Sequence, residues 1–310
     1  MIMGLHVDRN NRVNVVGQTY GNFPIDGSLY SDGNSGQFIA RYNSALTERD
    51  LSTTFGSGAG RPDITINAFL VDECGKFFVS GWGGNIDDKG FSLSNRSLSN
   101  MPLTGDALRS NTDGSDFYIA VFEEDMNGLL FGSYIGGSRT GDHVDGGTSR
   151  FDERGIIYQS VCASCPSTGY YVSDFPTTAG AYSETNKSYR CSNASFKYAA
   201  INFNAPPNMN DTLYEVIATE ELEFTYLITD PDLDTILVNF DMEDQYTGFF
   251  RQFPRFVRSV ETLESEFVFK PTCGLIGDTV FIDVIASDIG CPNTEDSNGR
   301  IGIIVKPPPV

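Results

Sequence analysis

An internal repeat is the feature that most constrains how this chain can fold. Residues 7–17, VDRNNRVNVVG, return as residues 71–81, VDECGKFFVSG, and more loosely as residues 151–160, FDERGIIYQS. Each copy places Asp together with Gly or Asn between two short apolar runs, and these residue types tolerate the backbone angles of a tight turn. Each copy therefore predicts a β-hairpin.

A second repeated unit lies between these hairpins. Residues 37–42, QFIARY, recur as residues 117–122, FYIAVF, and begin again at residues 196–201, FKYAAI. Ile39 and Ile119 lie 80 residues apart. Two hairpins per period make four strands, which is the content of one β-propeller blade. The pattern predicts an all-β fold with four-stranded blades and a period of about 80 residues.

The chain divides near residue 205, where Asn204-Ala205-Pro206-Pro207 indicates a stiff, extended linker. We expect residues 1–204 to hold about two and a half blades, fewer than the four that the smallest closed propeller contains. Residues 205–310 have the length and the short apolar runs of an immunoglobulin-like β-sandwich. The sequence thus predicts a partial β-propeller followed by a sandwich.

The net charge of −20 excludes several classes of partner. Nucleic acid and anionic membranes repel such a chain. No stretch approaches the roughly 18–20 apolar residues of a membrane span, so membrane insertion is not expected. Residues 205–310 hold 19 Asp and Glu against 6 Lys and Arg, so the predicted sandwich carries most of the charge.

Several motifs of the first 204 residues resemble a known repeat. Residues 13–19, VNVVGQT, followed by Phe23-Pro24, and residues 173–182, SDFPTTAGAY, resemble the bacterial β-propeller repeat. The copies around Cys74 and His143 resemble large gliding-motility-associated, type-nine-secreted surface proteins. This resemblance implies an extracellular protein whose signal peptide and sorting domain lie outside the given sequence.

The second part of the chain resembles a different family. Residues 224–235, FTYLITDPDLDT, and residues 286–290, ASDIG, are similar to bacterial cadherin-like and immunoglobulin-like repeats. Cadherins bind Ca²⁺, and the resemblance implies Ca²⁺ as a cofactor here.

Asp230, Asp232 and Asp234 alternate along one extended segment, so their carboxylates point to one side. Three like charges repel unless water or a cation separates them, and hard oxygen ligands suit Ca²⁺. Asp288 can approach from a neighbouring strand end. These four residues are candidate Ca²⁺ ligands, and a solvated acidic turn that begins with Pro231 is the other interpretation.

Six cysteines are compatible with three disulfides in an oxidising compartment, or with buried thiols in a reduced protein. They are Cys74, Cys162, Cys165, Cys191, Cys273 and Cys291. The Cys-x-x-Cys pair at 162 and 165 lacks the helix of a redox motif and the second pair of a zinc site. We expect Cys191 to bond Cys162 or Cys165, and Cys273 to bond Cys291, with Cys74 left to the other loop cysteine or free.

Catalytic motifs are lacking. His6 and His143 are the only histidines, and no Gly-x-Ser-x-Gly motif accompanies them. We therefore expect a non-enzymatic surface module, part of a large adhesin or gliding-associated protein, that binds an extracellular glycan or protein and adjoins other domains of a longer chain. A propeller-based hydrolase or lyase and an inert stalk are the alternatives.

Overall fold

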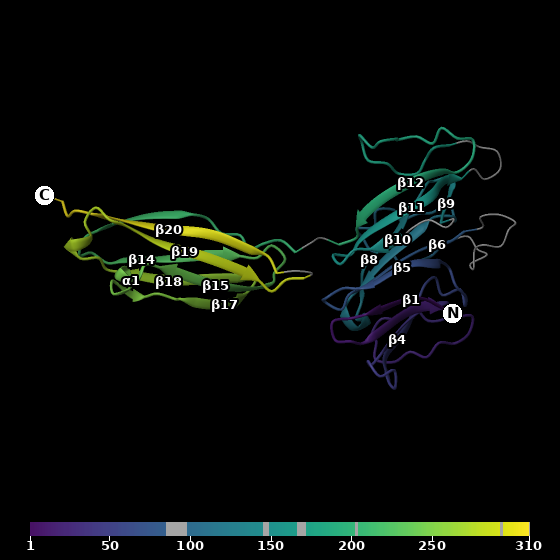
Figure 1. The fold of residues 1–310 in the computed structure, drawn as a ribbon, viewed down its shortest axis with the longest axis horizontal. Helices are drawn as coiled ribbons and strands as arrows, with labels where there is room; N and C mark the ends of the chain where they lie inside the picture. Colours follow the sequence, from purple (N-terminus) through teal and green to yellow (C-terminus); the bar gives the residue numbers. More distant parts are fainter. Residues whose placement is uncertain (85–97, 145–148, 166–171, 202–203, 292–293, 310) are drawn as a thin grey trace. The chain divides into compact units, whose positions relative to one another are not determined.

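The computed structural model describes residues 1–84, 98–144, 149–165, 172–201, 204–291 and 294–309. The chain forms two compact units, Met1–Asn202 and Phe203–Val310 (Figure 1). Almost all regular structure is strand, so the expected all-β class is confirmed. The units divide two residues before the expected boundary at 204/205.

Two four-stranded antiparallel sheets open the first unit, each with its strands in chain order. The first sheet comprises β1 (Ile2–Val7), β2 (Val13–Gln18), β3 (Gln37–Tyr42) and β4 (Arg49–Phe55). The second sheet comprises β5 (Thr65–Val71), β6 (Phe77–Trp82), β7 (Phe117–Phe122) and β8 (Leu129–Ile135), with the short η1 (Glu124–Met126) before β8.

A third sheet in the same unit has the order β10-β11-β12, and β9 also pairs with β11. Its strands are β9 (Gly141–His143), β10 (Ser149–Phe151), β11 (Ile156–Cys165) and β12 (Ser192–Ala199). Among the described residues, β12 ends this sheet without a further strand beside it.

The repeated Asp residues explain the hairpins. Asp72 accepts hydrogen bonds from the backbone N–H groups of Cys74 and Lys76, and Gly75 adopts a φ of +77° in the same turn. Asp8 and Asp152 cap their own turns in the same way. Each of the three predicted hairpins is therefore confirmed, because one buried or half-buried carboxylate satisfies the turn N–H groups.

The second sheet lies between the other two and contributes to two cores. One core joins Val16, Ile39 and Leu51 of the first sheet to Phe77 and Tyr118 of the second. The other core joins the opposite face of the second sheet to the third sheet through Phe78, Ile119, Phe131, Ile157 and Val161. Apolar residues on both faces of each central strand make this stacking possible.

The second unit is a β-sandwich. Its five-stranded sheet has the order β13-β20-β19-β15-β17, and its three-stranded sheet has the order β14-β18-β16. The strands are β13 (Thr212–Ile217), β14 (Leu222–Thr229), β15 (Thr235–Met242), β16 (Phe250–Gln252), β17 (Phe256–Val260), β18 (Thr262–Phe269), β19 (Thr279–Asp288) and β20 (Asp296–Lys306). The short α1 (Asp244–Thr247) and η2 (Cys273–Leu275) lie in connections.

Strict alternation of buried and exposed residues builds this sandwich. Along β19 every second residue from Val280 to Asp288 is buried, and these side chains face the other sheet. The core contains Phe240, Phe267 and Phe269, each at most 1% exposed. β13 pairs with β20 in parallel, whereas the other pairings are antiparallel.

Candidate functional site

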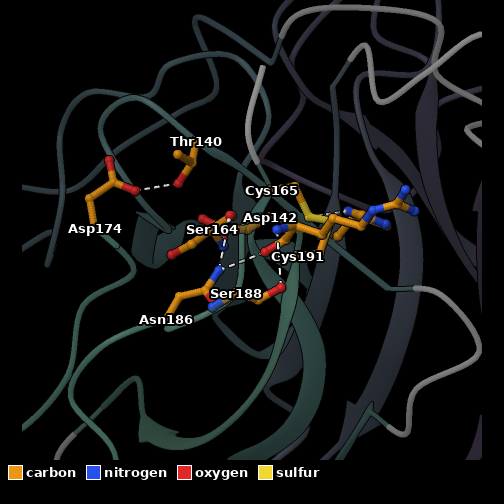
Figure 2. The surroundings of a disulfide bond; sticks show 10 residues. Thr140, Asp142, Ser164, Cys165, Asp174, Asn186, Ser188 and Cys191 are labelled. Atoms are coloured by element: carbon orange, nitrogen blue, oxygen red, sulfur yellow. Dashed lines mark hydrogen bonds between the residues drawn. A yellow bond between two sulfur atoms is a disulfide. The ribbon is translucent and has the colours of Figure 1, made fainter. Parts of the chain in front are cut away.

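A disulfide anchors a long loop to the third sheet. Cys165, the last residue of β11, bonds Cys191, which immediately precedes β12, and their Cα atoms lie 4.1 Å apart (Figure 2). Of the two pairings left open by the sequence, Cys165 and not Cys162 bonds Cys191. Cys162 lies inside the ladder, opposite Asn193, where a bond to Cys191 would distort both strands. We call residues 172–191 the anchored loop.

Asn186 organises one end of the anchored loop. Its side-chain Nδ2 donates to the carbonyl oxygens of Arg190 and Ser164, at 2.8 and 3.4 Å. Its Oδ1 accepts from the N–H of Ser188 at 2.7 Å, as Figure 2 shows. One half-buried side-chain amide thus replaces the backbone pairing that an irregular loop lacks.

Asp174 attaches the other end of the loop to the turn after β8. Its Oδ2 accepts from the N–H groups of Ser138 and Arg139, both at 2.7 Å. Its Oδ1 accepts from the hydroxyl of Thr140, as Figure 2 shows. The carboxylate is therefore held by several donors, and it belongs to the SDFP motif of the sequence. These contacts place the loop beside β12.

The anchored loop and β12 enclose an open cavity of about 600 Å³. Six consecutive residues of β12, 192–197, line one wall, and Phe175, Tyr182 and Glu184 belong to the loop wall. Phe175 packs against Phe196 with ring centroids 5.8 Å apart, while Tyr182 is fully exposed. Aromatic rings beside hydroxyl and amide groups are the usual lining of a ligand site.

Two carboxyl groups meet inside the first unit, around Gly136. Asp116 and Asp142 are both 0% exposed. A Cβ on Gly136 would lie 1.9 Å from Asp116 Oδ1 and 2.7 Å from Asp142 Oδ2, so only glycine fits between them. Asp142 accepts from the N–H groups of Gly137 and Ser164, at 2.7 and 2.8 Å.

Burial raises the pKa of Asp116 to about 7 and the pKa of Asp142 to about 8. The Thr112 hydroxyl and the Asp113 N–H both donate to Asp116 Oδ2, and Oδ1 has no hydrogen-bond partner among the described residues. Two carboxyl groups buried side by side retain a proton near neutral pH, because burial disfavours the charged form and two negative charges repel.

The first sheet has a related site with different chemistry. A Cβ on Gly56 would lie 2.6 Å from Asp63 Oδ2 and 2.7 Å from a side-chain amide atom of Gln37. Asp63 accepts from the N–H of Ser57, as Asp142 does from Gly137. An amide therefore occupies the place that the Asp116 carboxyl takes in the second sheet.

His143 is buried beside the disulfide. Its Nδ1 lies 3.5 Å from Cys165 Sγ, and its ring centroid lies 5.7 Å from that of Trp82. Both contacts lie beside the second core, to which Trp82 and the nearby Ala163 of β11 belong.

Three of the four residues expected to bind Ca²⁺ lie together in the second unit. One ligand oxygen each from Asp230, Asp232 and Asp234 falls within 4.8 Å of the others. Asp230 is 3% exposed, and its Oδ1 accepts from the N–H groups of Asp232 and Asp234, both at 2.9 Å. Its Oδ2 has no hydrogen-bond partner among the described residues.

Asp288 is connected to this group through the linker. It is 0% exposed, and its Oδ1 accepts from Asn204 Nδ2 at 2.8 Å and from the Glu295 N–H at 2.9 Å. The next linker residue, Ala205, donates its N–H to Asp232 Oδ2 at 2.6 Å. Asp288 Oδ2 also lacks a hydrogen-bond partner within the described part of the chain.

The expected Cys273–Cys291 disulfide is wrong. Cys273 is an exposed free thiol in η2, before the start of β19, whereas Cys291 follows the end of that strand. A strand of ten residues separates its ends by about 30 Å. Disulfide Cα atoms lie within about 7 Å of each other, so this strand keeps the two cysteines apart.

Three groups of site residues carry no local sequence signal of their role. Asn204 and Ala205 were interpreted only as a linker, although both hydrogen-bond to acidic residues. Asp116 and Asp142 lie 26 positions apart and share no local motif. Asn186, whose amide holds the anchored loop, has no sequence motif that distinguishes it from the other asparagines in loops.

No family model and no curated protein matches this chain. Among solved structures, it is similar to the sialic acid binding region of a Streptococcus sanguinis SK1 adhesin, with 10% identity over 95% of this chain and 78% of that one, and a TM-score of 0.26. Titin fragment I67–I69 matches with 9% identity over 97% and 94% and a TM-score of 0.24. WR4, a C. elegans MSP family member, matches with 8% identity over 30% and 91% and a TM-score of 0.24.

None of the described helices is long and apolar enough to cross a membrane.

Proposed function

We propose that this chain is a non-catalytic binding module of a large extracellular protein. The observation that carries this proposal is the anchored loop, which a disulfide and the Asn186 and Asp174 side chains hold beside β12 to form a cavity. A loop that is fixed at both ends loses little entropy when it binds a ligand. Aromatic and hydroxyl groups in the lining suit a glycan or a protein segment.

The disulfide supports an extracellular location, because such bonds persist in oxidising compartments. Together with the motifs that resemble type-nine-secreted surface proteins, it supports assignment to an adhesin or a gliding-associated protein. A partner chain or glycan outside the cell, and other domains of the same protein, would be its contacts.

We infer that the three sheets of the first unit are consecutive blades of an incomplete propeller. The support is positional equivalence between the first two sheets. Val71 and Phe77 are buried in the core between the sheets, and Phe69 packs against this core. The equivalent Val7 and Leu5 of the first sheet are 50% and 60% exposed on the same face.

Val15 and Ala40 on the same face of the first sheet are buried in a small cluster of their own, so the exposed apolar part of this face is Leu5 and Val7 on β1. In the second sheet the equivalent part of the face is covered by a neighbouring sheet. We infer that one more blade of the same kind covers Leu5 and Val7 in a longer assembly, because exposed apolar strands favour association.

We also propose that Asp230, Asp232 and Asp234 bind Ca²⁺, with Asp288 as a nearby supporting carboxylate. The support comes from the two buried carboxylate oxygens, Asp230 Oδ2 and Asp288 Oδ2, that no described hydrogen-bond donor satisfies. A buried charged oxygen without a donor is costly, and a hard cation would neutralise it. Through the hydrogen bonds of Asn204 and Ala205, bound Ca²⁺ would also stiffen the linker segment.

The binding function is tested on the full chain with a printed glycan array and an array of extended peptides. We expect saturable binding that the Tyr182→Ala variant weakens at least about tenfold, since an exposed aromatic in a lining contributes on the order of 1.4 kcal/mol or more. Tyr189→Ala is the matched control, because Tyr189 lies in the same loop and does not line the cavity.

The ligand is recovered after incubation and analysed by mass spectrometry. Unchanged ligand agrees with a non-catalytic module, whereas cleaved ligand would assign the chain to the hydrolases or lyases. Equal binding by the Tyr182→Ala variant would show that the anchored loop is not the site.

A further inference from the structure

Among the residues that the structure describes, the third sheet has no counterpart of the fourth strand of the first two sheets. β3 pairs with β2 on one edge and with β4 on the other, and β7 pairs in the same way with β6 and β8. β12 holds the equivalent third position and pairs with β11 from Ser192 to Ala199. Within the described part of the chain, the other edge of β12 pairs with no strand.

The cavity lies along this open edge. Residues 192–197 all contribute to its lining. The cavity therefore follows the backbone of β12 over six residues and is not formed around one side chain. The side-chain hydrogen bonds that hold the anchored loop run to Ser164 and to residues 138–140, so they leave the backbone of β12 available. The loop therefore stands beside the edge without completing the sheet (Figure 1).

We propose that the cavity accepts an extended β-strand of another polypeptide, which pairs with β12 as the fourth strand of the third sheet. An open strand edge presents backbone N–H and C=O groups at a spacing that only another extended backbone matches along its length. Peptide ligands bind other proteins by such strand addition. This proposal rests on the proposed binding function and specifies its ligand class.

The side chains on the two faces of β12 determine which residue types the added strand should have on each face. Phe196 and Tyr198 face the core shared with the second sheet, and Phe175 of the loop packs on Phe196. Ser195 and Lys197 lie on the opposite face. The added strand should therefore alternate apolar and polar residues, with an acidic residue favoured beside Lys197. Residues 192–197 span about 20 Å, enough for a partner of about six residues.

Two strands of the protein itself provide the sequences of the peptides for the experiment. We use two synthetic peptides with the sequences of β4, RDLSTTF, and β8, LLFGSYI, because these strands fill the equivalent place in the other sheets. Calorimetry with the full chain measures affinity, and hydrogen exchange locates the bound peptide. We expect saturable binding by at least one peptide and slower exchange of the amides in residues 192–197.

N-methylated peptides separate strand addition from side-chain recognition. In one version of the bound peptide every odd residue is N-methylated, and in the other every even residue. Only one edge of an added strand faces β12, so we expect one version to lose affinity at least tenfold and the other to retain it. Equal affinity of the two versions, or protection outside β12 and the anchored loop, would overturn the proposal.

The outcomes also distinguish this proposal from the binding function on which it rests. If a glycan binds in a Tyr182-dependent manner and neither peptide binds, strand addition is refuted and the binding function stands. If neither class of ligand binds, both are refuted.

Discussion

At the scale of single residues, the buried carboxyl groups of Asp116 and Asp142 are the groups of the first unit that we expect to titrate near neutral pH. The glycine between Asp116 and Asp142 has no room for a side chain, and the related glycine in the first sheet lies between Asp63 and Gln37. An amide and a protonated carboxyl are similar in shape, and both can donate a hydrogen bond. The second sheet thus has the same arrangement as the first, but its hydrogen bonding depends on pH because a carboxyl group replaces the amide.

Replacement of Asp116 by Asn should stabilise the first unit at alkaline pH. Burial raises the pKa of Asp116 to about 7 and of Asp142 to about 8 in the folded chain, above the values of the unfolded chain. The folded state then holds these two protons more tightly, so the stability that the pair contributes is fully present below about pH 4 and is lost as the pH rises through 7 to 8. At pH 8.5 we expect Asp116→Asn to gain about 1 to 3 kcal/mol.

Urea unfolding followed by Trp82 fluorescence measures this effect, because the only tryptophan lies in the first unit. The exposed Asp106→Asn variant is the control and should keep the wild-type pH profile. If the wild-type stability does not change between pH 4 and 8.5, the two carboxyl groups do not retain a proton in the way proposed.

Gly136→Ala should destabilise the first unit at every pH. Its Cβ would overlap Asp116 Oδ1 at 1.9 Å, and overpacking of this kind costs about 1 to 3 kcal/mol. Gly105→Ala serves as the control, because a Cβ on Gly105 meets no atom within 4 Å. The same urea titration compares both variants, and equal stability would argue against the tight fit.

At the scale of elements, the anchored loop shows how an irregular segment becomes a binding wall. The disulfide fixes the loop where β12 begins, and Asp174 fixes it to the turn after β8. The regular strands provide the platform, and the loop provides the exposed aromatic side chain.

Removal of the disulfide in a Cys165→Ser, Cys191→Ser variant should cost about 3 kcal/mol, since the bond closes a loop of 26 residues. Hydrogen exchange should become faster in residues 172–190, and Trp82 fluorescence should report a lower urea midpoint. Cys273→Ser is the control, because that thiol is free and exposed. Unchanged exchange in the loop would mean that Asn186 and Asp174 suffice to hold it.

At the scale of the whole molecule, the two units differ in charge and in how they are stabilised. Residues 205–310 hold 19 acidic and 6 basic residues, and the carboxylates of Asp230, Asp232 and Asp234 lie close together. The first unit instead relies on stacked sheets with two cores. Cation binding should therefore affect one unit and leave the other unchanged.

Millimolar Ca²⁺ should stabilise the second unit of the full chain by more than about 5 °C, because a cation bound only by the folded state shifts the equilibrium toward it. Slower hydrogen exchange in β15 and β19 should accompany the shift, while the Trp82 transition stays in place. Asp230→Asn should abolish the effect, and the exposed Asp241→Asn should preserve it. An equal response of the Asp230→Asn variant would locate the cation elsewhere.

The sequence by itself determined the local structure of this protein. The Asp-containing turns predicted all three hairpins, because a carboxylate bonds N–H groups only two and four residues away. Asp230, Asp232 and Asp234 also lie together, but in a turn and not in the extended segment that was expected. Such contacts depend on neighbouring residues, and neighbours are visible in any sequence.

Only the tertiary structure decided contacts between distant residues. In the folded chain Cys165, and not Cys162, forms the disulfide with Cys191. The length of β19 separates Cys273 from Cys291. The carboxyl groups of Asp116 and Asp142 lie side by side. The tertiary structure also placed a cavity beside the edge of β12 that pairs with no strand of the described residues. These outcomes depend on strand register and sheet order, because a shift of one residue turns a side chain to the other face.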